Sequence, residues 1–205
     1  MAVQLELSLD FVRFSEETRE IQTDLNKYLN VVELRYFGYR SADSASIIKL
    51  IGEALEWAPI AVAATVYLST IAKHAADATW DKARSMIQHN KVGPLAHIAN
   101  TLSIAATKVN PNAQIVVGIT FPDENIAVEL TINSGTTEEI ILDLSVFVLQ
   151  SEKLSRLLQV EIQKGNMPIG SAVAEIQCNG SLLVKWTRAS DLRKQELIIP
   201  VLAKD

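Results

Sequence analysis

The sequence has few of the residues on which enzymatic chemistry most often depends. Its 205 residues include one cysteine, Cys178, and three histidines. A single cysteine excludes an internal disulfide and is typical of a reducing compartment. Three histidines leave few general bases for chemistry near neutral pH. No serine lies in a Gly-x-Ser-x-Gly context, and no HExxH, CxxC or phosphate-loop pattern is present.

Charge is also sparse. Charged residues make up 21% of the chain and apolar residues 48%, and the formal net charge is −5. This composition excludes intrinsic disorder, collagen and a disulfide scaffold, and it lacks the positive field that concentrates nucleic acid. The first seventeen residues contain no basic segment followed by a long apolar run. A signal peptide is therefore not expected, and we expect a cytoplasmic protein.

The charge distribution divides the chain. Residues 1–56 carry a net charge of −4, residues 57–112 of +3, and residues 113–205 of −4. The apolar period changes at Asn110-Pro111-Asn112, which is the best candidate boundary. We therefore predict a mainly helical region with N-terminal strands at 1–110 and an α+β region with two hairpins at 111–205, or one continuous domain over both.

The first 56 residues predict a strand, a helix and a strand. Apolar and polar residues alternate over 5–9, which is typical of a half-buried strand. Ser15 suits a helix N-cap, and Glu16-Glu17 suits an acidic first turn. Residues 31–39 are rich in β-branched and aromatic side chains, which favour a second strand. A further helix is predicted to start at Ser41 or Asp43 and to carry Ile47, Ile48, Ile51 and Leu55. The helical pattern breaks near Glu56–Trp57 because Pro59 suits only a first turn.

The middle of the chain is predicted to be helical. A long apolar helix starts at 57 and runs to about Asn90, where Gly93-Pro94 would end it. Residues 95–109 predict another helix, with Ile98, Leu102 and Ala105-Ala106 facing inward.

Beyond residue 112 the pattern predicts hairpins around one long helix. Residues 115–121 and 126–132 alternate as paired strands. Residues 136–164 allow either a strand or a helix, and the capping box of Thr136 with Glu139 favours one long helix. Asn179-Gly180 between 173–178 and 181–187 predicts a type I′ hairpin turn, and 197–202 predicts a last strand. The fold class is therefore α+β, with a C-terminal antiparallel sheet packed on a long helix.

The apolar run 57–72 is the most distinctive feature. It has sixteen residues without a charge, fewer than the roughly twenty of a membrane span. Burial on all sides, in the core or at a subunit interface, is the favoured interpretation, and a segment that inserts in or lies on a membrane is the alternative. The candidate interaction or membrane residues are Trp57, Ile60, Ala64, Tyr67, Leu68 and Trp80.

Metal chemistry has one weak candidate. His74, Asp77 and Asp81 share one helical face, and a histidine with two carboxylates can bind a divalent cation that activates water. A solvated polar face is the favoured interpretation, since three such residues often occur together by chance.

The remaining candidates favour structural interpretations. Cys178 lies in a predicted strand, where a lone cysteine is usually a packed small side chain. The segment 165–170 is predicted to form the end of a helix and a turn. Arg188, Arg193 and Lys194 follow Trp186, whose ring could stack a base, but a solvated hairpin loop is favoured.

These observations together favour a non-enzymatic binding or self-assembly module with no cofactor, with no nucleic-acid partner, and with a second copy or another protein as its partner. A membrane-acting protein, toxin-like or a defence effector, that uses the helix 57–72 is the first alternative. A metal-dependent hydrolase is the second.

Overall fold

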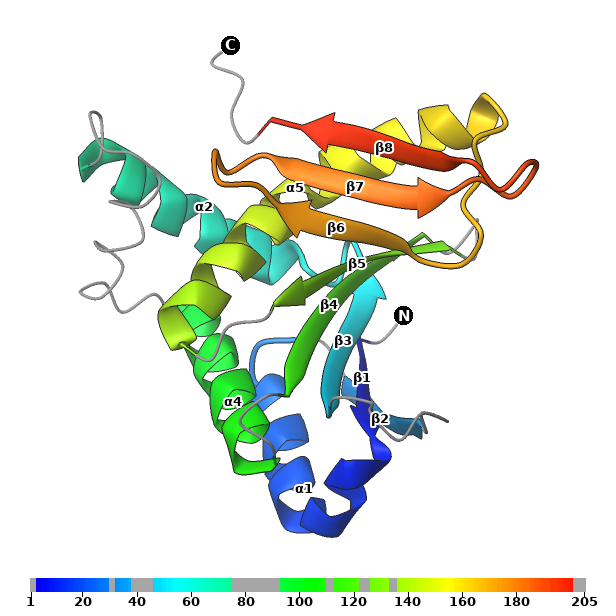
Figure 1. Cartoon of the computed structure of the whole chain (residues 1–205). Helices are drawn as coiled ribbons and strands as arrows, with labels where there is room; N and C mark the ends of the chain where they lie inside the picture. Colours follow the sequence, from blue (N-terminus) through cyan, green and yellow to red (C-terminus); the bar gives the residue numbers. More distant parts are fainter. Residues whose placement is uncertain are drawn as a thin grey trace.

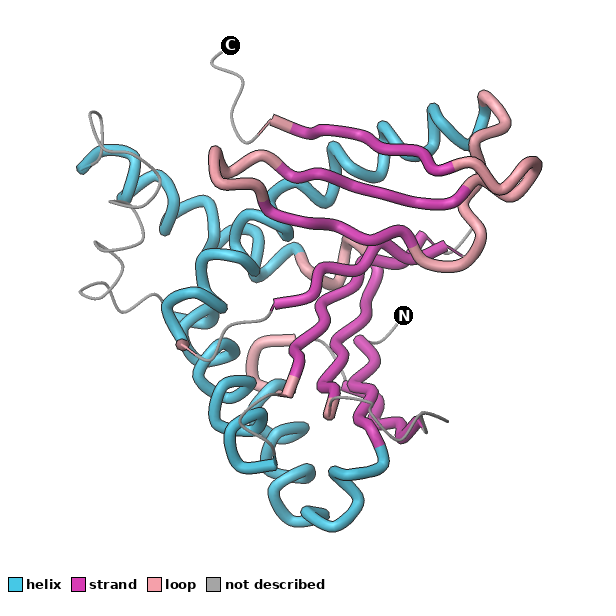
Figure 2. Tube along the Cα trace, in the orientation of Figure 1, coloured by secondary structure: helices cyan, strands magenta, loops and turns pink. Residues whose placement is uncertain are grey.

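Eight strands form one mixed sheet, and four α-helices pack on one face of it, within the part of the chain that the structure describes (Figure 1). The computed structural model describes residues 3–29, 32–37, 46–74, 93–109, 113–121, 126–132 and 136–200. Figure 2 shows the helices gathered on one side of the strands. The predicted α+β class is confirmed.

The elements follow one another along the chain in this order: β1 (Val3–Ser8), the 3₁₀ helix η1 (Leu9–Phe14), α1 (Ser15–Leu25), β2 (Val32–Phe37), β3 (Ile47–Glu53), α2 (Ala58–His74), α4 (Gly93–Val109), β4 (Gln114–Phe121), β5 (Ile126–Ile132), α5 (Thr137–Gln163), β6 (Ala172–Ile176), β7 (Leu182–Thr187) and β8 (Lys194–Ile199). The predicted strands, helices and hairpins at 5–9, 31–39, 95–109, 115–132 and 173–187 are therefore present.

The strand order is β2-β1-β3-β4-β5-β6-β7-β8. The pairs β1–β2, β3–β4 and β5–β6 are parallel, and the other neighbours are antiparallel. The pair β3–β4 joins the regions 1–110 and 111–205, because Ile48 lies opposite Ile115 and Leu50 opposite Val117. One sheet and one apolar core therefore run across the region boundary.

Two of the helical crossovers have opposite hands. Strand β5 runs in the same direction as β1, because two of the three pairings between them are antiparallel. Strand β2 lies on one side of β1, and β6 lies on the opposite side of β5. Helices α1 and α5 both pack on α4 and cover the same face (Figure 1). One of the crossovers β1-α1-β2 and β5-α5-β6 therefore departs from the right-handed rule.

The helix predicted to start at Ser41 or Asp43 is wrong, because Ile47–Glu53 forms the central strand β3. Ile48 and Leu50 face the helices, while Ile47 on the opposite face is also buried. The opposite face of β3 also carries the apolar residue Ile51, which is partly buried. Apolar residues on both faces break the alternation that identifies most strands, and they then imitate a helical stripe.

The ends of three helices differ from expectation. Ser15 is the first residue of α1 rather than its cap, and the N-cap is Phe14 with no side-chain hydrogen bond. Gly93 and Pro94 are the first two residues of α4, two residues before the predicted start at Leu95, and a proline fits a first helical turn because no N–H is needed there. Helix α2 starts as expected, while its predicted extension to Asn90 lies outside the described residues.

Residues 136–164 form one long helix, as the capping box predicts. The Glu139 amide donates to the Thr136 hydroxyl at 3.4 Å, and that hydroxyl donates to the Glu139 carboxylate at 2.7 Å. The buried residues of α5 include Ile140, Leu144 and Phe147. The helix contacts α2, α4 and strands β4 to β7, so it is the central helix of the packed layer.

The turn between β6 and β7 differs in type from the prediction. The Gly180 amide donates to the Gln177 carbonyl at 2.8 Å, and Gly180 has a φ of 79°. Asn179 keeps a negative φ, whereas a type I′ turn needs positive φ at both residues. The loop is therefore a three-residue turn that ends in a glycine bulge.

Candidate functional site

The inward face of α2 fills the core of the protein itself. Trp57, Ile60, Ala64 and Tyr67 are fully or almost fully buried, and Leu68 is partly buried against the same core. A spacing of three or four residues places the buried side chains along one stripe. These predicted interaction residues therefore pack inside one chain, and the remaining candidate, Trp80, lies outside the described residues.

Close packing at the start of α2 depends on Gly52. A Cβ atom at this position would lie 3.1 Å from a Val3 methyl carbon and 3.3 Å from the Trp57 indole nitrogen. The glycine in β3 therefore lets the indole lie directly on the sheet. Among the described residues the indole N–H has no hydrogen-bond partner, and neither has the Tyr67 hydroxyl. Burial and the charge of Glu138 raise the pKa of Tyr67, so this phenol stays protonated.

The outward face of α2 is apolar and open to solvent. Val62 is 68% exposed and Val66 is 60% exposed, while Leu55, in the turn before the helix, is 79% exposed. Pro59 is exposed between them. We name these four residues, Leu55, Pro59, Val62 and Val66, the outer seam. The apolar run is therefore half-buried in the single chain, rather than covered on all sides.

A hollow of about 440 Å³ adjoins the outer seam. Leu55 and Pro59 form one wall of it together with Glu56, and the opposite wall is the chain after α1, residues 26–29. The Asn26, Lys27, Tyr28 and Leu29 amides all donate to carbonyls of the last turn of α1, which holds this wall in place. The hollow is large enough to receive a side chain of another molecule.

A second cavity, of about 100 Å³, lies between α1 and α4. Asp24 and His97 line it, with the Asp24 carboxylate 3.9 Å from the His97 Nε2 atom. The hydrogen bond from Lys27 lowers the pKa of Asp24, and the nearby imidazole lowers it further. The Tyr28 and His97 rings lie 4.9 Å apart. The His97 Nε2 atom is buried, and among the described residues it has no hydrogen-bond partner.

The metal candidate is only partly inside the described chain. His74 is the last residue of α2, but its side chain lies outside the description, as do Asp77 and Asp81. Within the described residues, no group of three or more His, Cys, Asp or Glu side chains is arranged to hold a metal ion. The described segments also contain no helix with the length and hydropathy needed to cross a bilayer.

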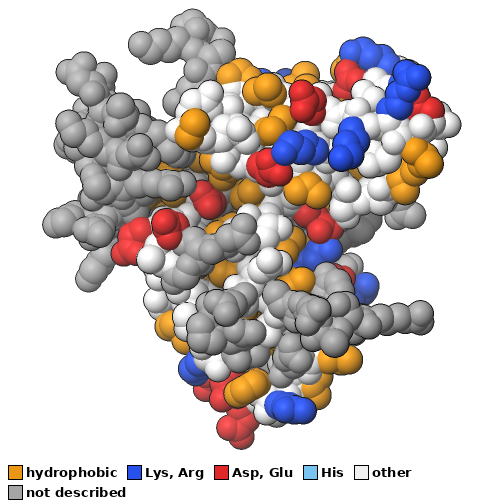
Figure 3. All heavy atoms as spheres, viewed as in Figure 1, with side chains coloured by type: hydrophobic (Ala, Val, Ile, Leu, Met, Phe, Trp, Pro, Cys, Tyr) orange, Lys and Arg blue, Asp and Glu red, His pale blue; other side chains and the backbone are white. Residues whose placement is uncertain are grey.

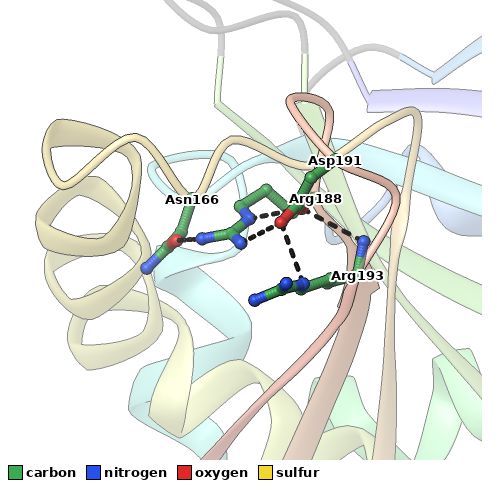
Figure 4. A network of polar contacts seen from close by, with 4 residues as sticks. All are labelled: Asn166, Arg188, Asp191 and Arg193. Atoms are coloured by element: carbon green, nitrogen blue, oxygen red, sulfur yellow. Dashed lines mark hydrogen bonds and ion pairs between the residues drawn. The ribbon is translucent and has the colours of Figure 1, made fainter.

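The basic segment after Trp186 packs differently from a base-stacking site. Trp186 is buried, and its indole N–H donates to the Asn166 carbonyl at 2.8 Å. Arg188 donates to the Asn166 side chain at 2.9 Å and to Asp191 at 2.7 Å (Figure 4). The indole is therefore not available to stack a base, and the loop around Arg188 and Arg193 is closed by ion pairs.

Two smaller expectations have different outcomes. Segment 165–170 is a helix exit and turn, as predicted, because Gly165 and Gly170 have φ values of 85° and 70°. Cys178 is exposed in the β6–β7 turn, so the prediction that it packs as a small buried side chain is wrong. Strand β6 ends at Ile176, two residues earlier than the sequence pattern suggests, which places the thiol outside the sheet.

Comparison of the chain with models of protein families, with curated protein sequences and with solved structures found no match.

Proposed function

We propose that the protein is a non-enzymatic binding and self-assembly module that uses the outer seam of α2 to dock on a second copy of the chain. The main observation in support is that α2 has apolar side chains on two opposite faces, and only one of these faces is buried. Ala64 and Tyr67 are buried in the core, while Val62 and Val66 on the other side meet solvent. Contiguous exposed apolar side chains are uncommon unless a partner covers them.

The spacing within the outer seam supports a helical partner. Within α2, Pro59, Val62 and Val66 are separated by three and four residues, and Leu55 lies in the turn just before the helix. This alternation places apolar side chains along the narrow stripe by which two helices pack. A two-fold dimer would bring the same seam of each copy into contact, as an isologous interface requires.

The seam alone is too small for a stable dimer. Stable interfaces bury about 800 Å² on each partner, which needs roughly 20–30 residues a side. The adjoining hollow extends the contact region to the chain after α1, where Lys27 and Asn26 supply polar groups for the rim. Such an interface has an apolar centre and a polar border, the arrangement found in protein complexes.

The proposal extends to the setting of the protein. A single cysteine supports a cytoplasmic location, and a net charge of −5 supports a protein rather than a nucleic-acid partner. No cofactor takes part in the proposed activity.

Multi-angle light scattering after size exclusion tests the proposal over a range of protein concentrations. The wild type is expected to form a dimer that dissociates on dilution, and the double variant Val62→Asp/Val66→Asp is expected to remain a monomer, because two carboxylates oppose burial of the seam. Thr65→Asp is the matched control, because it adds a carboxylate at an exposed position of the same helix beside the seam.

A wild type that remains a monomer at every concentration overturns the proposal. A double variant that dimerises as strongly as the wild type, with Thr65→Asp unchanged, places the interface elsewhere and overturns the role of α2.

A further inference from the structure

Two loops are joined into one rigid end of the sheet. The chain after α5 and the β7–β8 loop lie side by side and project beyond the strands at the same end (Figure 1). The Ala189 amide donates to the Met167 carbonyl at 2.7 Å, and the Ile169 amide donates to the Thr187 carbonyl at 2.8 Å. Pro168 forms a β-bridge with Arg188. We name residues 161–170 and 188–194 the sheet tip.

Ion pairs fix the shape of the sheet tip. The Arg188 guanidinium binds both carboxylate oxygens of Asp191, and the Arg193 Nε atom lies 3.2 Å from the same carboxylate. These two arginines lower the pKa of Asp191 to about 2, with the hydrogen bond from Arg188 as the main cause. Asp191 therefore stays ionised at physiological pH, and its carboxylate links Arg188 with Arg193 across the loop (Figure 4).

The fixed loop presents a leucine to solvent in a strained backbone conformation. Leu192 has a φ of 60° and is 68% exposed. A bulky residue is rarely found in the left-handed region, and such strain is often retained where it serves function. Met167 and Ile169 of the neighbouring loop are also exposed, so three apolar side chains project from one end of the molecule.

The sheet tip is positively charged although the whole chain is acidic. It contains four cations, Lys164, Arg188, Arg193 and Lys194, against the two acids Glu161 and Asp191, a net charge of +2. The net charge of the whole chain is −5, so the remainder of the molecule carries the negative charge. Figure 3 shows Lys and Arg side chains together at the upper right, where Figure 1 places the β7–β8 loop, with apolar side chains beside them.

We propose that the sheet tip docks on an anionic phospholipid surface, with Leu192, Met167 and Ile169 inserted among the headgroups. Lys194 and the net positive Arg188–Asp191–Arg193 cluster would face the phosphates, while Lys164 pairs with Glu161 at 2.7 Å. Because the tip projects from the molecule, its apolar and basic side chains can contact a flat surface at the same time. Apolar side chains flanked by Lys and Arg are the combination that binds the boundary between headgroups and acyl chains. The acidic remainder of the chain is repelled by the same lipids, which orients the tip toward the membrane.

Vesicle co-sedimentation tests this inference on the full chain, with vesicles of phosphatidylcholine alone or mixed with phosphatidylglycerol. The wild type is expected to sediment with the mixed vesicles only. The variant Arg193→Gln/Lys194→Gln is expected to weaken binding by about fivefold for each lost charge. Leu192→Asn is expected to weaken binding about tenfold, because the inserted apolar side chain is lost.

Asparagine is chosen at position 192 so that a loss of vesicle binding can be distinguished from a loss of folding. Asparagine tolerates the left-handed conformation, so Leu192→Asn should keep the loop and the melting temperature. Leu9→Asn is the matched control, because Leu9 is an exposed leucine that begins η1 directly after β1, near the edge of the sheet opposite β8. This control is expected to bind as the wild type does.

The inference is overturned if the wild type fails to bind the mixed vesicles, or if it binds both kinds of vesicle equally. It is also overturned if Leu192→Asn and the double charge variant both bind like the wild type. Because the outer seam lies on α2 and is untouched by these variants, failure of lipid docking and failure of self-assembly are separate results.

Discussion

At the scale of single residues, two neighbouring positions of α2 differ sharply in environment. Ala64 is fully buried, whereas Val62 is 68% exposed, although both lie in one apolar run. The sequence offers no charged residue in this run that would distinguish the two sides. Mutation at these positions therefore separates the contribution of the core from that of the outer surface.

Ala64→Asp is expected to lower the free energy of unfolding by roughly 3–5 kcal/mol, because an unpaired charge enters the core. That is a large share of the roughly 5–15 kcal/mol of a typical domain. Val62→Asp adds the same carboxylate at an exposed position and is expected to change the free energy by less than about 0.5 kcal/mol. Urea denaturation followed by circular dichroism, under conditions where both proteins are monomeric, measures both. Equal stability of the two variants would contradict the assigned orientation of α2.

At the scale of elements, the sequence predicts features that depend on adjacent residues better than features that depend on contacts between distant segments. The sequence predicts the cap of α5 correctly because Thr136 and Glu139 interact across one helical turn, so four consecutive residues contain the whole signal. The sequence predicts β3 wrongly because its place in the centre of the sheet is set by pairing with β1 and β4, which are distant in sequence. The β6–β7 turn was located correctly, but the negative φ of Asn179 is not encoded in the dipeptide alone.

The N-cap of α5 gives a prediction at this scale. Thr136→Ala removes the hydroxyl that accepts from the Glu139 amide, and it is expected to lower the free energy of unfolding by about 1 kcal/mol. The control is Thr65→Ala, in the middle of α2, where the hydroxyl donates to the Ala61 carbonyl and caps nothing. Guanidinium denaturation should show a clear loss for the cap variant and almost none for the control. Equal losses would mean that the cap does not stabilise α5 against unfolding.

At the scale of the whole molecule, the central pairing is β3 with β4. These strands come from the two regions predicted at 1–110 and 111–205, and they share seven paired positions from Ile47–Gln114 to Glu53–Thr120. Strand order and crossover hand depend on contacts between distant segments, so the sequence could not predict them. The side of α2 that faces the core also depends on distant segments. The sequence therefore predicts interaction residues on α2 that are in fact buried, and it does not distinguish the exposed outer seam.

The continuous sheet predicts one cooperative unfolding transition. Neither region can lose its strands without exposing the apolar side chains of the other, such as Leu50 and Val117. Differential scanning calorimetry is expected to show a single peak whose calorimetric and van't Hoff enthalpies agree. Two separated peaks, with the first assigned to residues 1–110 by loss of α2 and α4, would show that the regions unfold as independent domains.

The position of Trp57 gives the molecule an optical reporter. Its indole lies against Gly52 with no exposed surface, so its fluorescence should be shifted toward short wavelengths and protected from dissolved quenchers. Replacing Trp80 and Trp186 by phenylalanine would leave this single emitter at the start of α2. A change in its colour or its quenching would then report, without any attached dye, whether α2 leaves the sheet when the protein meets its partner.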